Sequence, residues 1–184
     1  HKVRGVGFYL EYLKRALQEF FPENNYIFFA QNKDIPADID LVHYPYFDPF
    51  FFTLPLFQST PFVVTIHDLI PLAYPEKFPK GLKGEVKWAV QRKALQSSRR
   101  IITDSNASEM DIQKIVGYES EKIDVIYLAP SPVFKPVADK SIILKVKQKY
   151  SLSGKFVLYV GDVNWNKNIP GLLEAFSKAS KDLK

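Results

Sequence analysis

An imidazole and a carboxylate follow each other at the end of a strongly apolar segment. His67 and Asp68 come directly after residues 62–66 (FVVTI), a β-branched run that is typical of a buried strand. Imidazole titrates near neutral pH and can orient a bound hydroxyl group or exchange a proton with it. Asp68 can belong to the same site, or it can simply cap the turn that follows. His43 also follows an apolar run, in LVHYP, and is the rival candidate.

Three other segments carry residues suited to an anionic ligand. Gly5 and Gly7 precede a helical pattern, where a backbone without side chains can approach a ligand and a helix N-terminus favours negative charge. Ser105, in the segment Asp-Ser-Asn after RIIT, opens another helical pattern. Gly161 ends a third apolar run, and Lys167 follows it in a loop, where an ammonium group can neutralise a diphosphate. Each segment also fits a simpler interpretation: a glycine turn, a helix cap and a surface lysine.

The elements that would position these residues alternate between apolar runs and helical patterns. We expect strands at 26–30, 41–44, 62–66, 100–103, 123–128 and 156–160. We expect helices at 6–20, 83–97, 106–116, 142–150 and 169–179, the third capped by Asn106 and the last by Asn168. Continuous apolar strands alternating with helices predict an α/β fold, with a parallel sheet covered by helices on both faces. Ligands of such sheets bind beyond the carboxyl ends of the strands.

A proline-rich connector at 129–136 divides the chain. We expect one domain over 1–136, and a linker with the beginning of a second α/β domain over 137–184. One strand and one helix cannot bury their own apolar faces. The second domain is therefore expected to be truncated.

Composition excludes several classes of function. The 184 residues contain no cysteine, so disulfides, thiolate metal sites and thiol catalysis are ruled out. The net charge of +5 is spread along the chain without a run of five basic residues, which argues against a nucleic-acid partner. No segment approaches the roughly 18 apolar residues of a membrane span. The absence of cysteine is compatible with a cytoplasmic location.

In order and spacing, these segments resemble glycosyltransferase family 4, the retaining enzymes of the GT-B fold. The matching segments are RGVGFYLEYLKRAL, VTIHDLIPLAYPEKFP, RRIITDSNASEMDI, EKIDVIYLAPSPVFKP and YVGDVNWNKNIPGLLEAF. TIHDLIP and YVG…NKN…LLEAF are the most specific of them. HDLIPL together with YPEKFP is most similar to the mannosyltransferase-like branch of the family, which builds O-antigen and related polysaccharides.

The resemblance implies two Rossmann-like domains facing each other across a cleft. The N-terminal domain would mainly hold a saccharide or lipid-linked acceptor, and the C-terminal domain a nucleotide sugar such as a GDP- or UDP-hexose. By this analogy, Gly5 and Gly7 lie beside the donor phosphates and Lys167 binds the diphosphate. His67 would contact the transferred sugar, with its backbone carbonyl stabilising positive charge, while Asp68, Ser105 and Gly161 would line the cleft. No metal or other cofactor is implied, because basic side chains and helix N-termini stabilise the leaving diphosphate.

The chain departs from the family pattern at several positions. Asn166 and Asp162 stand where members often carry arginine, and Arg4 replaces the first glycine of the usual pair. By the same resemblance, we expect the family's paired glutamates to lie beyond Lys184 and the strand that normally precedes the glycine segment to lie outside this sequence. We therefore expect this chain alone to be inactive. A non-catalytic carbohydrate-binding or regulatory module on the same fold is the alternative.

The segment 44–57 (YPYFDPFFFTLPLF) is unusually aromatic. It is either a core segment between two strands or a hydrophobic surface for a lipid-linked acceptor or a membrane. The second interpretation predicts peripheral association with the inner face of a membrane.

Overall fold

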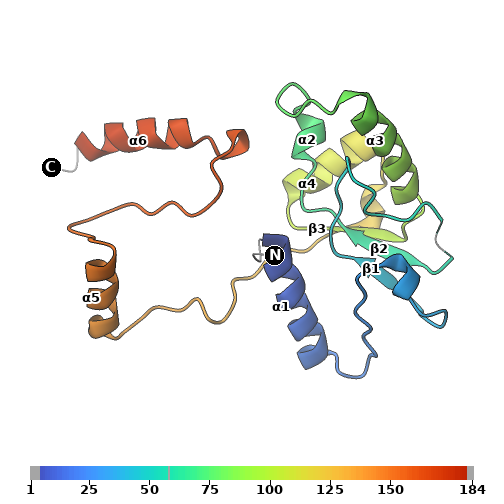
Figure 1. Cartoon of the computed structure of the whole chain (residues 1–184), viewed down its shortest axis with the longest axis horizontal. Helices are drawn as coiled ribbons and strands as arrows, with labels where there is room; N and C mark the ends of the chain where they lie inside the picture. Colours follow the sequence, from blue (N-terminus) through green and yellow to red (C-terminus); the bar gives the residue numbers. More distant parts are fainter. Residues whose placement is uncertain (1–4, 58, 182–184) are drawn as a thin grey trace. The chain divides into compact units, whose positions relative to one another are not determined.

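A computed structural model describes residues 5–57 and 59–181 of the chain, which form two compact units (Figure 1). The first unit ends at Ser131 and the second begins at Pro132. Each unit is described by itself.

A four-stranded parallel sheet forms the centre of the first unit. Its strands are β1 (Val42–Tyr44), β2 (Phe62–Thr65), β3 (Arg100–Thr103) and β4 (Ile123–Val125), in that spatial order. Val64 is the pairing partner of Tyr44 on one side and of Ile101 on the other. All three pairings are parallel, as the continuous apolar runs predict.

The two faces of this sheet differ in polarity. One face is apolar and buried, and consists of Val42, Tyr44, Phe62, Val64, Ile101 and Ile123. The opposite face carries His43, Thr65 and a cross-strand ion pair between Arg100 and Asp124, whose Nε and Oδ2 lie 2.5 Å apart. A parallel sheet needs helices on both faces, and the structure supplies them. In Figure 1, α2, α3 and α4 lie on one side of the sheet and α1 on the other.

The helices follow the predicted pattern with shifted ends. α1 spans Gly5–Phe20, α2 Ile70–Ala73 and α3 Gly81–Leu95. α2 was not expected from the sequence. Ala94 and Leu95 of α3 pack into the core that covers the apolar face of the sheet. The fold class predicted from the sequence is thereby confirmed.

The predicted helix 106–116 is built from two pieces. α4 covers Asn106–Asp111, and a π-helical segment, η2, covers Ile112–Val116. The cap is Ser105, one residue before the predicted Asn106: its side-chain oxygen accepts a hydrogen bond from the Ser108 amide at 3.1 Å. Gly117 ends the helix with φ of +74°, a conformation that costs glycine little and other residues more.

The predicted strand 26–30 is wrong, because these residues make no ladder hydrogen bonds. Phe29 instead packs edge-on against Tyr44, with ring centroids 6.2 Å apart. Three short 3-10 helices also occur in the described chain: η1 (Asn32–Asp34), η3 (Ser120–Lys122) and η4 (Trp165–Lys167).

The second unit contains α5 (Lys140–Lys149), η4 and α6 (Ile169–Lys181). The predicted strand 156–160 is also wrong: the segment is exposed and unpaired, because a strand needs a neighbour to satisfy its backbone. Asn168 lies before α6 as predicted, and its Oδ1 accepts from the Gly171 amide at 3.4 Å. Pro170 occupies the first turn, where a missing amide hydrogen costs little.

Candidate functional site

His67 and Asp104 form a side-chain pair at the carboxyl edge of the sheet. Asp104 directly follows β3, and His67 lies two residues beyond the end of the neighbouring strand β2. His67 Nδ1 lies 3.0 Å from Asp104 Oδ2. Their side chains are only 18% and 21% exposed. A carboxylate can only accept a hydrogen bond, so Nδ1 must carry the proton in this pair. In the neutral imidazole, Nε2 is then an acceptor, and it is buried without a partner among the described residues.

The backbone of His67 is fixed by α4. Ser108 donates its hydroxyl hydrogen to the carbonyl oxygen of His67 at 2.8 Å, and Ser105 donates in turn to Ser108 at 3.0 Å. A carbonyl oxygen has two lone pairs, and Ser108 uses one of them. The Ser105 hydroxyl is therefore engaged in capping α4 and in this chain of hydroxyl groups.

A second polar cluster lies beside the pair. Thr65 Oγ1 is 2.8 Å from His43 Nε2 and 3.2 Å from the hydroxyl oxygen of Tyr9 in α1. The ring of Tyr9 also meets the ring of His67 at 87°, with centroids 4.8 Å apart. Burial lowers the pKa of His43, which favours its neutral form. His43, the rival candidate, is thus held one strand away from His67, and Tyr9 contacts both clusters.

Asp68 lies on the exposed side of the turn that follows His67. Its Oδ1 accepts from the Ile70 amide at 3.0 Å, so it fixes the start of α2.

Tyr46 donates its hydroxyl hydrogen to Asp48 at 3.0 Å. Burial, the charge and hydrogen bond of Asp48, and the charge of Asp68 together raise the pKa of Tyr46 to about 12. This phenol therefore remains a hydrogen-bond donor at neutral pH.

The two glycines lie inside α1 rather than in a loop before it. Gly5 is its first residue and Gly7 lies in its first turn. A Cβ atom added at Gly5 would meet no atom within 4 Å, so no contact among the described atoms requires glycine there. Arg4 lies outside the described residues.

Lys167 and Gly161 lie in the second unit. Lys167 ends η4 and is exposed, and its amide donates to Asn164 at 3.1 Å. A Cβ atom on Gly161 would come within 2.6 Å of the Tyr159 hydroxyl oxygen, which donates to the Asp162 carbonyl. A side chain at 161 would thus force Tyr159 to move.

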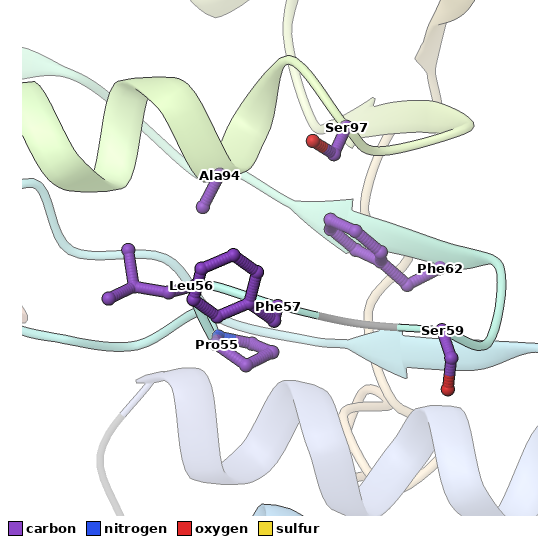
Figure 2. A pocket seen from close by; sticks show the side chains of 7 residues that line it. All are labelled: Pro55, Leu56, Phe57, Ser59, Phe62, Ala94 and Ser97. Atoms are coloured by element: carbon purple, nitrogen blue, oxygen red, sulfur yellow. The ribbon is translucent and has the colours of Figure 1, made fainter.

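A cavity of about 470 Å³ lies away from these side chains, at the amino end of β2. Figure 2 shows it between the loop 55–59 and the last turns of α3, lined by Pro55, Leu56, Phe57, Ser59, Phe62, Ala94 and Ser97. The described side chains that line it include no titratable group. Over residues 5–57 and 59–181, no three His, Asp or Glu side chains gather closely enough to hold a metal ion.

Sequence reasoning singled out His67, but it did not predict the contacts of His67 with Tyr9 and Ser108. Asp104 was noted only as part of a helix start. Its contact with His67 had a signal in the sequence, because adjacent parallel strands end at the same edge and both residues directly follow a predicted strand. Tyr9 gave no such signal: only the packing of α1 on the sheet brings it there.

A four-stranded parallel sheet flanked by helices defines this unit as a Rossmann-like α/β domain. A sequence profile of glycosyltransferase family 4 matches residues 3–129, more than two thirds of the chain. The chain therefore belongs to glycosyltransferase family 4.

One relative with a known activity indicates which branch of the family the chain resembles. The chain is 32% identical over 115 residues to the O-antigen chain mannosyltransferase B of Escherichia coli, which supports the mannosyltransferase-like branch. The match covers 62% of this chain but only 30% of that protein. No solved structure is a significant match to the chain.

Proposed function

We propose that this chain is the acceptor-side part of a longer retaining glycosyltransferase, which moves a hexose, for example mannose, from a nucleotide sugar to a saccharide or lipid-linked saccharide. Family membership and the mannosyltransferase relative support glycosyl transfer. The single structural observation behind the site is the half-buried His67–Asp104 pair at the carboxyl edge of the sheet.

His67 is proposed to contact the transferred sugar. Asp104 holds the imidazole with the proton on Nδ1, which leaves Nε2 as a hydrogen-bond acceptor. Because Nε2 is buried in this structure, a sugar hydroxyl can reach it only when the side chains that cover it move. The remaining lone pair of the His67 carbonyl can face positive charge on the sugar carbon, since Ser108 occupies only the other one. Tyr9 packs on the imidazole and limits its rotation.

The donor phosphates are proposed to meet Gly5, Gly7 and Lys167. Both glycines lie among the first described residues of α1, a 16-residue helix, and the N-terminal end of a helix favours an anion. Lys167 is exposed, so its ammonium group stays hydrated and charged and is accessible to a phosphate. We propose that leaving-group charge is stabilised by these groups without a metal or other cofactor.

We place this enzyme in the cytoplasm, where it can reach nucleotide sugars, with an acceptor at the inner face of the membrane. None of the helices in the described residues is long and apolar enough to cross a bilayer.

Calorimetric titration of the full-length protein with GDP, UDP and ADP in the presence of EDTA tests the donor side. We expect one diphosphate to bind, and Lys167→Ala to weaken it about tenfold, the value of one charge-assisted contact. Lys178→Ala is the matched control, since Lys178 is paired with Glu174 on the same unit at 2.7 Å. Absence of binding to every diphosphate would favour the carbohydrate-binding module instead.

A further inference from the structure

An apolar surface interleaved with lysines lies on the first unit. It is formed by the loop between β1 and β2 and the first turns of α3, and comprises Phe51, Phe52, Leu82, Lys83, Val86 and Lys87; all but Phe51 line one shallow groove. The two phenylalanines are each 63% exposed, and Leu82 is 87% exposed. Monomeric proteins rarely leave large apolar side chains gathered in this way without a binding partner.

The aromatic segment 44–57 contributes some side chains to the core and others to this surface. Tyr44, Phe47 and Leu54 are buried in the core, which agrees with the structural interpretation of the segment. Phe51 and Phe52 point away from it and stay exposed. Both sequence-based interpretations thus apply, to different side chains of the same segment.

The exposed phenylalanines are held in place by a buried glutamine of α3. Gln91 Oε1 accepts from the amides of Thr53 and Leu54, both at 2.9 Å, and Gln91 Nε2 donates to the Leu54 carbonyl at 3.0 Å. Asp48 Oδ1 accepts from the Phe50 amide at 2.8 Å at the start of the turn. The loop is therefore anchored on both sides of Phe51 and Phe52. These hydrogen bonds hold the backbone in the conformation that leaves the two rings exposed.

The charge of the surface is positive. Lys87 Nζ lies 5.2 Å from the ring centroid of Phe51 and 6.0 Å from that of Phe52. α3 carries Lys83, Lys87, Arg92 and Lys93 against a single acidic residue, Glu85, which is already paired with Lys80 at 3.0 Å. No carboxylate lines the groove.

We propose that this surface docks the protein on an anionic phospholipid bilayer. Exposed aromatic and aliphatic side chains can enter the boundary between headgroups and acyl chains, while lysines beside them meet lipid phosphates. A protein partner would need acidic groups facing Lys83 and Lys87, whereas an anionic leaflet supplies negative charge over its whole area. This docking would hold a lipid-linked acceptor near the site, and in that respect it extends the proposed function. Binding to vesicles itself does not depend on glycosyl transfer.

Flotation of full-length protein with vesicles tests the proposal. We expect binding to vesicles of phosphatidylcholine with phosphatidylglycerol, little binding to phosphatidylcholine alone, and weakening by salt. Lys83→Gln with Lys87→Gln should reduce the partition coefficient about thirtyfold, because one lysine near an anionic surface contributes about fivefold. Phe51→Ser with Phe52→Ser should reduce it at least about tenfold, because both rings lose contact with the lipid.

Met110→Ser with Lys114→Gln is the matched control, since Met110 and Lys114 are an exposed apolar and basic pair on the same unit. It should leave the partition coefficient unchanged. Four results would overturn the proposal: no binding at low salt, equal binding to neutral vesicles, an equal loss in the control, or a dimer in sedimentation that the Phe51 and Phe52 variant dissociates. Nucleotide binding is measured on the same variants. Nucleotide binding without vesicle binding would overturn the docking proposal alone, and vesicle binding without nucleotide binding would count against the proposed function alone.

Discussion

Replacement of Asp104 by asparagine tests how the imidazole of His67 is held. The substitution keeps the size of the side chain and one carbonyl oxygen, but it removes the negative charge. The amide of asparagine can accept from Nδ1–H or, after rotation, donate to an unprotonated Nδ1. We therefore expect His67 to change from a single neutral tautomer, protonated at Nδ1, to a mixture of both.

The size of the effect follows from the geometry. The 3.0 Å contact joins side chains about one-fifth exposed, so solvent screening is limited. A hydrogen bond to a charged group contributes about 1.5–3 kcal/mol and a neutral one about 1 kcal/mol. Asp104→Asn should thus lower the free energy of unfolding by roughly 1 kcal/mol. In the full-length enzyme, a loosened imidazole should lower kcat/KM by about ten- to a hundredfold, as expected for a misplaced contact group.

Long-range ¹⁵N–¹H spectroscopy of the histidine side chains reports the tautomer directly. His43 is the internal control, because it contacts Thr65 and not Asp104. Its signals should not change in Asp104→Asn. A wild-type His67 protonated at Nε2, or an Asp104→Asn variant with an unchanged tautomer and unchanged kcat/KM, would refute the reasoning.

Three further predictions concern stability. Gln91→Leu should lower the free energy of unfolding by about 2–4 kcal/mol in urea titrations, because it leaves the amides of Thr53 and Leu54 without their acceptor; a loss below about 1 kcal/mol would show that the loop is not anchored there. Gly117→Ala should lower the melting temperature through a cost of about 1 kcal/mol, since φ at this position is +74°; an unchanged melting temperature would contradict the helix end described. His43 has a folded-state pKa lowered by burial from 6.5, so the folded protein binds fewer protons than the unfolded chain. Neutral His43 therefore gives its full contribution to the free energy of unfolding above the unfolded-state pKa of 6.5. This contribution is lost as the pH falls below that value toward the folded-state pKa. Urea midpoints should drop between about pH 7.5 and about pH 5.5, and less so in His43→Gln; equal drops would assign the effect to other groups.

The parts of the fold that the sequence predicts well are those with a strong local signal. The β-branched runs around Val64 and Ile101 became paired strands, and the amphipathic pattern after Gly5 became α1. The predictions at 26–30 and 156–160 failed because an apolar run becomes a strand only when a neighbour accepts its hydrogen bonds, which is a property of the tertiary structure.

The position of His67 was predictable to a similar extent. Its place after a predicted strand put it at the carboxyl edge of the sheet, and parallel topology brings Asp104 to the same edge. The contacts of Tyr9 and Ser108 depend on how α1 and α4 pack, which no local pattern encodes. The roles of His67, Gly5, Gly7 and Lys167 stay predictions.

The most direct test of the proposed function is hexose transfer by the full-length protein. Radiolabelled GDP- and UDP-hexoses are supplied with a lipid-linked saccharide in the presence of EDTA, and labelled product is counted for the wild type, His67→Ala and, as a control, His43→Gln. We predict transfer from one of the donors, a loss of about a hundredfold in His67→Ala, and a much smaller loss in His43→Gln. Transfer at the wild-type rate by His67→Ala would contradict the assignment of the site, and no transfer from any donor would contradict the proposed function.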